Sequence, residues 1–239
     1  MMKHILYADS VKINDAISIR IPTVGEVWDD EDNYFTAVSA IISTPYDMMV
    51  QLDAVGVDFT TINAFELFCM QFGVLQDMNT ELVFGDLDLS KFVPAMNRKT
   101  SEMVLYDSEN NLVIDRAIHE DISNCIKRIL QIKKEAKKPG NDEARTYMIR
   151  IAKMNMRKQK RLAEKKDTSQ LEDIIISLVN SGEFPYDYES VRNISIHQLY
   201  LSLNQIAHRI RYDNTMGGYY AGTIRFEDLK QEDRSWLKP

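Results

Sequence analysis

Histidine and cysteine are the residues with which this sequence could bind zinc or carry out nucleophilic catalysis. The chain contains His4, His119, His197, His208, Cys69 and Cys125. None of the histidines forms an H-E-x-x-H pair or lies near a cysteine at the spacing of a zinc site. His119-Glu120-Asp121 is a run of possible ligands, but successive residues of a helix point in different directions. Both cysteines fall on apolar helical faces, where thiols are buried and unreactive. We therefore expect neither a metal site nor a cysteine nucleophile.

Two further motifs could contact a cation or a phosphate group. Asp86-Leu87-Asp88 is a D-x-D pair, which can hold a divalent cation, but no glycine-rich nucleotide loop accompanies it, so we expect a solvated loop. The run Gly217-Gly218-Tyr219-Tyr220-Ala221-Gly222 matches neither G-x-G-x-x-G nor a P-loop. We expect a turn there, with tyrosines that pack or lie at an interface. The sequence predicts no cofactor and a protein that is not an enzyme.

The strongest pattern in the sequence is a segregation of charge. Residues 127–166 contain 15 Lys and Arg against four acids, a balance of +11, and the remaining 14 bases and 32 acids give −18, which together make the net −7. Such a basic run can bind an acidic partner or nucleic acid, or it can be a solvated helix that links two acidic bodies. The acidic remainder argues against a dedicated DNA-binding protein. The candidate partner-binding residues are Lys153, Arg157, Lys158, Lys160, Arg161, Lys165 and Lys166.

The N-terminal half is expected to contain the strands. Residues 17–21 alternate apolar and polar side chains, which predicts a half-buried strand, and residues 3–8 are its expected partner. Acidic residues 29–32 are expected to open a helix, Thr44-Pro45 to open another that ends at Gly56, and Gly73 to close a third that begins near Asp58. Residues 102–106 and 112–114 should form a hairpin around the turn-forming residues 107–111.

The C-terminal half is expected to be helical. Apolar residues at helical spacing predict a helix from residue 118 to about 138, which Pro139-Gly140 breaks, and Asn141 caps the basic helix that follows. Ser169 and Glu172 have the spacing of a capping box for a helix ending near Gly182, and residues 195–211 form the clearest amphipathic helix. These two helices are expected to pack against each other. The fold class is α+β and predominantly α-helical, with a mixed unit at 1–116, a basic helical connection at 117–166 and a small helical unit at 167–239.

Seven stretches carry a resemblance to a known family. They are Ile21–Trp28, Pro45–Asp53, Val57–Thr60, Phe84–Leu89, Ile114–His119, Tyr188–Arg192 and Tyr219–Gly222. Read together, they make the chain similar, over nearly its whole length, to proteins from the tail modules of tailed phages and prophages of Gram-positive bacteria. The resemblance implies a tail assembly chaperone, which binds the long helical tape-measure protein before the tail tube polymerises around it. It brings no catalytic residues.

Several alternatives remain open beside the chaperone. The protein could be a structural component of the neck or tail, which would stay in the virion, or a nucleic-acid-binding phage regulator that uses the basic helix. Self-association is also compatible with the sequence. No apolar run approaches the ~18 residues needed to cross a bilayer, and the N-terminus lacks the apolar core of a signal peptide. We expect the protein in the host cytoplasm, neither secreted nor in a membrane.

Overall fold

A computed structural model describes residues 4–97, 100–133, 138–164, 166 and 168–237. It is α+β and predominantly helical, as the sequence predicts. The helices are α1 (Val24–Asp29), α2 (Glu31–Ile42), α3 (Met49–Ala54), α4 (Ala64–Gln76), α5 (Glu81–Phe84), α6 (Arg116–Ile129), α7 (Asp142–Ala163), α8 (Gln170–Val179) and α9 (Ile196–Tyr220). Short 3₁₀ turns are η1 (Leu89–Lys91), η2 (Ser190–Asn193), η3 (Phe226–Asp228) and η4 (Gln231–Arg234). The strands are β1 (Ser10–Lys12), β2 (Ser18–Arg20), β3 (Val93–Met96), β4 (Met103–Asp107) and β5 (Leu112–Ile114).

The N-terminal strand pair differs from the prediction in one strand. The alternating segment forms β2, but its partner is β1, so Val11 lies opposite Ile19 and both are buried. Residues 4–8 form no strand, and residue 3 lies outside the described residues. The Asn14 side-chain oxygen accepts hydrogen bonds from the Ala16 and Ile17 amides and folds the connection back tightly. This local turn brings the nearer segment, residues 10–12, beside β2.

Capping residues set where the helices of the first half begin. Thr23 and Glu26 form a capping box that starts α1, a helix absent from the sequence prediction, and the acidic run then opens α2 at Glu31 as expected. Thr44 does not start a helix directly, because it exchanges hydrogen bonds with Asp47 in a separate turn and α3 begins only at Met49. Gly56, with φ of +77°, ends that segment as predicted.

The predicted closure of a helix at Gly73 is wrong, because α4 continues through that residue to Gln76. It also begins later than predicted, since Asn63 and Glu66 form its capping box. Gly inside a helix costs about 1 kcal/mol relative to Ala. Burial of the Leu75 side chain and the 2.9 Å hydrogen bond from Gln76 Nε2 to the Phe92 carbonyl, both beyond Gly73, offset that cost.

The predicted hairpin is confirmed as β4 and β5, and β3 pairs antiparallel with β4 to complete a three-stranded sheet. The helix expected to reach residue 138 ends at Ile129, because Gln131 takes a left-handed conformation (φ +55°) that lets Leu130 turn into the core. Residues 134–137 of that expectation lie outside the described residues. The predicted turn at 217–222 is wrong in its first part, since α9 runs to Tyr220 and includes Gly217 and Gly218.

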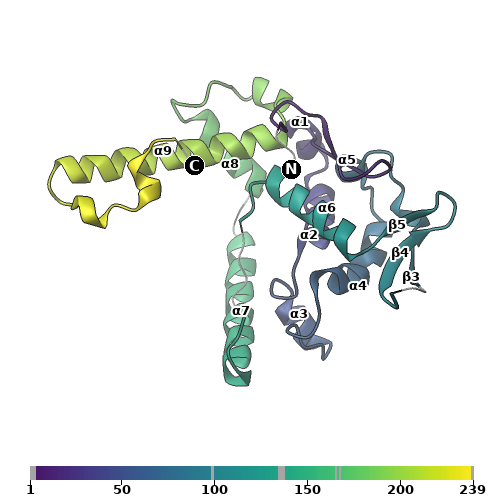
Figure 1. Cartoon of the computed structure of the whole chain (residues 1–239). Coiled ribbons are helices and arrows are strands. Elements are labelled where there is room, and N and C mark those ends of the chain that lie inside the picture. The colour runs from purple at the N-terminus through teal and green to yellow at the C-terminus, as the bar shows by residue number, and fades with distance from the viewer. Residues whose placement is uncertain (1–3, 98–99, 134–137, 165, 167, 238–239) are drawn as a thin grey trace.

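One main core joins segments from all parts of the chain. It contains buried residues of β1, β2, α1, α2, α4–α6, α8 and the first turns of α9. The beginning of α9 is hydrogen-bonded to the segment before α1, through Val24 N to the Ile194 carbonyl at 2.8 Å and Ile196 N to the Pro22 carbonyl at 2.9 Å. Figure 1 shows α9 extending from this body as an arm, with the C-terminal segment folded back along it, and α7 standing beside the body next to α3. The predicted pair α8 and α9 shares this core, while α9 packs most closely on α1, α6 and η4.

Candidate interaction surfaces

The buried histidines serve the fold as hydrogen-bond donors. His119 donates from Nε2 to the Ile41 carbonyl at 3.0 Å and stacks on Phe68 with ring centroids 4.4 Å apart. Burial lowers the His119 pKa to about 4, so the ring is neutral at pH 7. His197 and His208 likewise pair with the carbonyls of Ile129 and Ser235, each at 2.8 Å. Burial raises the pKa of Cys69 and Cys125 to about 11, which keeps both thiols protonated.

The D-x-D motif has a local structural task. Asp88 Oδ1 accepts hydrogen bonds from the Ser90 amide at 3.0 Å and the Ser90 hydroxyl at 2.6 Å, and so caps η1. These hydrogen bonds hold the pKa of the Asp88 carboxyl below its usual range.

Among the described residues, no group of three or more His, Cys, Asp or Glu side chains is placed to hold a metal ion. In that same part of the chain, no helix is long and apolar enough to cross a membrane.

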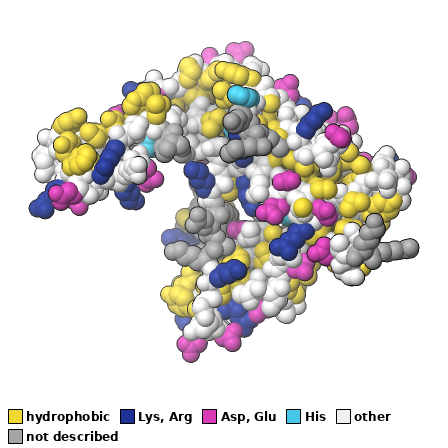
Figure 2. Space-filling view, viewed as in Figure 1, with side chains coloured by type: hydrophobic (Ala, Val, Ile, Leu, Met, Phe, Trp, Pro, Cys, Tyr) yellow, Lys and Arg dark blue, Asp and Glu magenta, His cyan; other side chains and the backbone are white. Residues whose placement is uncertain are grey.

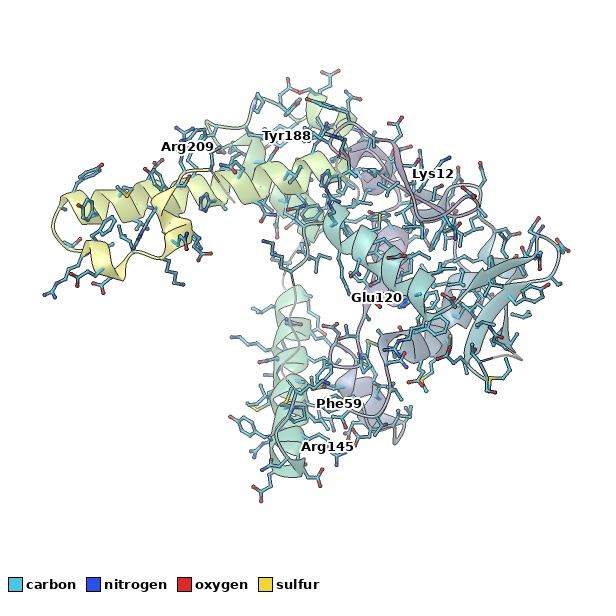
Figure 3. The ribbon with its side chains drawn as sticks, viewed as in Figure 1. Lys12, Phe59, Glu120, Arg145, Tyr188 and Arg209 are labelled. Atoms are coloured by element: carbon cyan, nitrogen blue, oxygen red, sulfur yellow. The ribbon has the colours of Figure 1, made fainter. Side chains whose placement is uncertain are left out.

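The first half of the basic helix α7 is docked onto the body. Ile149 packs against the second hydrophobic cluster, formed by Leu52, Phe59 and Leu67. Arg145 forms an ion pair with Asp58, and Lys153 Nζ lies 2.7 Å from Asp53 Oδ2. Figure 3 places Arg145 and Phe59 at the same side of α7, facing α3. The candidate residue Lys153 therefore anchors α7 to the body.

The second half of α7, residues 154–163, is exposed along its length, and we call it the free half. No residue of α7 is buried. Arg157, Lys158, Lys160 and Arg161 are exposed and make no ion pair within the described residues, and Met154 and Arg157 also line a hollow between α7 and the segment that contains Asp53 and Asp58. Lys166 pairs with Asp173 at the start of α8, and Lys165 lies outside the described residues. Of the seven candidates, the structure brings four together on the free half.

A groove of about 800 Å³ runs between α2, the end of α6, α7 and α9. Its apolar lining includes Phe35, Ile42 and Met148, and Lys127 and Lys133 also line it. Tyr200 of α9 contributes a half-buried ring, whose pKa burial raises above its ordinary value. The open space that Figure 2 shows between α7 and the α9 arm lies on the side of α7 away from α2 and α3, whose residues line this groove.

Sequence reasoning missed this groove because its lining comes from elements far apart in the chain. Methionine enrichment was the one signal that pointed to it: Met49 and Met148 line the groove, and flexible Met side chains suit adaptable binding surfaces. Nothing in the spacing of these residues predicts that they converge.

One comparison with known proteins gives a match. Residues 163–239, which begin at the last residue of α7, match the family model described as the YomV second domain. YomV is a protein of the Bacillus prophage SPβ region, and the match is consistent with a phage-related protein family. No curated protein and no solved structure matches the chain.

Proposed function

We propose that this protein is a phage tail assembly chaperone that binds a helical segment of the tape-measure protein in the groove between α2 and α7. The observation that carries the proposal is the groove itself: about 800 Å³, with apolar side chains from several elements and two lysines in its lining. An amphipathic helix binds such a groove by inserting apolar anchors that repeat at three- and four-residue spacing. The phage context of the C-terminal match and the family resemblance support the choice of this partner.

The groove lining can adapt to helical segments with different side chains, as a long helical partner would present. Met49 and Met148 have three rotatable side-chain bonds, and both are half-buried, so they can repack around different anchors. Phe35 and Tyr46 provide rigid rings at the same site. The lining contains Lys127 and Lys133 and one acid, Asp47, so acidic residues beside the apolar anchors would bind best.

The test measures binding of overlapping peptides from the phage's tape-measure protein by fluorescence anisotropy, with the wild-type chain and two variants. Met148→Glu places a charge in the groove and should weaken the tightest peptide by about tenfold or more, a loss of about 1.4 kcal/mol. Met156→Glu is the matched control, because Met156 is on the same helix, 42% exposed, and does not line the groove. Equal affinities of the two variants for the peptide would contradict the groove as the binding site. If no peptide binds the wild-type chain, the proposed chaperone function is contradicted.

Mass spectrometry of purified particles separates the proposal from a structural role. A chaperone acts before the tail is complete and should be absent from mature virions, whereas a neck or tail protein would be present. Binding to DNA or RNA that weakens steeply with salt would instead indicate a regulator acting through α7.

A further inference from the structure

The free half of α7 has a chemically complementary surface on the chain itself. Arg157 and Arg161 are four residues apart, so they share one face of the helix, and Met154 lies on that same face three residues before Arg157. Met154 is 57% exposed and Leu162 is 53% exposed. The free half therefore presents unpaired cations beside large apolar side chains. The apolar component favours a protein partner over a nucleic acid backbone.

The complementary surface is a second groove of about 470 Å³, formed by α2, α4 and the start of α8. Its apolar lining includes Phe35, Met48 and Val74, and Val74 is 53% exposed. Glu31 and Asp32 give it negative charge, and its lining contains no Lys or Arg. We call it the acidic groove.

Among the described residues, the acidic groove has an exposed carboxylate without an ion pair and a buried acceptor without a hydrogen bond. Asp32 makes no ion pair within the described residues and is exposed in the first turn of α2. Gln71 lines the groove, and its side-chain oxygen is buried with no hydrogen-bond partner in that same part of the chain. A guanidinium donor would pair with the Gln71 oxygen once the Gln71 side chain rotates toward the groove surface.

We propose that the free half of α7 in one copy of this chain binds the acidic groove of a second copy. Arg157 and Arg161 would face Asp32 and the Gln71 oxygen, while Met154 would cover Phe35 and Val74. The argument for a second copy is that opposite charge and exposed apolar surface are both present on this one chain, in segments that make no ion pair with each other. When each copy supplies one helix and one groove, the two contacts are equivalent and close a dimer.

The experiment measures molar mass by light scattering on a sizing column, across protein concentrations and at low and high salt. Wild type should move from monomer toward dimer as its concentration rises, and high salt should oppose this because exposed charges are screened. Arg157→Glu/Arg161→Glu should weaken association by roughly tenfold or more, as should Asp32→Lys/Thr36→Lys in the acidic groove. Thr36 is an exposed lining residue of that groove.

Mixing the two double variants provides the decisive measurement. In the mixed dimer, one contact joins the original helix to the original groove, and the other joins an acidic helix to a basic groove. Both contacts then have opposite charges, so the mixture should dimerise more tightly than either variant alone. Lys12→Glu/Lys230→Glu makes the same change in net charge as Arg157→Glu/Arg161→Glu, at exposed residues elsewhere, and should associate like wild type.

Circular dichroism of each variant checks that it is folded. A wild-type chain that stays monomeric at every concentration, or a mixture that stays monomeric, would overturn the proposal. The groove of about 800 Å³ shares Phe35, Ser39 and Gln170 with the acidic groove, but it is tested separately by Met148 and Met156, which are not substituted here, so a monomeric chain could still bind a tape-measure peptide.

Discussion

The buried His119 ring makes the stability of this protein sensitive to mild acid. Its side chain is 3% exposed, it donates to the Ile41 carbonyl, and burial lowers its pKa from the ordinary 6.5 to about 4. Because the folded pKa is the lower one, the unfolded chain binds a proton more readily. The stabilising contribution is complete above pH 6.5 and is lost as the pH falls toward 4. Between pH 7 and pH 5, the free energy of unfolding should decrease by about 2 kcal/mol through this residue alone.

His119→Gln isolates the contribution of this ring. Glutamine keeps an N–H donor for the Ile41 carbonyl but does not titrate, so the variant should be less stable than wild type at pH 7 and lose less stability at pH 5. Urea denaturation at several pH values between 5 and 7 measures both effects. His4→Gln makes the same substitution at an exposed residue and should keep the wild-type slope.

If the free energy of unfolding falls equally steeply between pH 7 and pH 5 in wild type and in His119→Gln, the reasoning is refuted. A separate measurement does not depend on the variant folding: NMR titration of the wild-type imidazole should find it neutral throughout this range. A His119 resonance that titrates above pH 6 would show that the ring is solvated in the native state.

Three further predictions concern other parts of the chain. Replacing Arg157, Lys158, Lys160 and Arg161 by Gln should change the free energy of unfolding by less than ~0.5 kcal/mol per residue in dilute, high-salt solution, and a failure to fold would show that the free half is structural. Leu203→Asp should lower the free energy of unfolding by roughly 2–3 kcal/mol in urea denaturation, because Leu203 packs on the main core, and should expose sites near residue 166 to protease. A variant that keeps its fold but no longer binds tape-measure peptides would place Leu203 in the binding surface instead. Cys69 and Cys125 should react slowly with a thiol reagent at pH 8 and rapidly in urea, and fast labelling of the native chain would contradict their raised pKa.

Local patterns determined most of the elements. The caps at Asn141 and Ser169 start α7 and α8 where predicted, because a side-chain oxygen that accepts an amide hydrogen bond acts within three residues. The hairpin of β4 and β5 and the left-handed Gly56 follow in the same way from turn chemistry. The basic character of α7 and its lack of a buried face are also properties of its own sequence.

Tertiary contacts decided the points that local patterns left open. Gly73 stays inside α4, because the packing of Leu75 and Gln76 beyond it outweighs its low helix propensity. Lys153 and Arg157 are both cations of α7 and look alike in the sequence. In the structure Lys153 pairs with Asp53, which is distant in sequence, while Arg157 makes no ion pair within the described residues. Both grooves combine residues from several elements. Their shape and charge depend on which helices the core brings together, and hydrophobic burial is not directional enough for one sequence pattern to specify that arrangement.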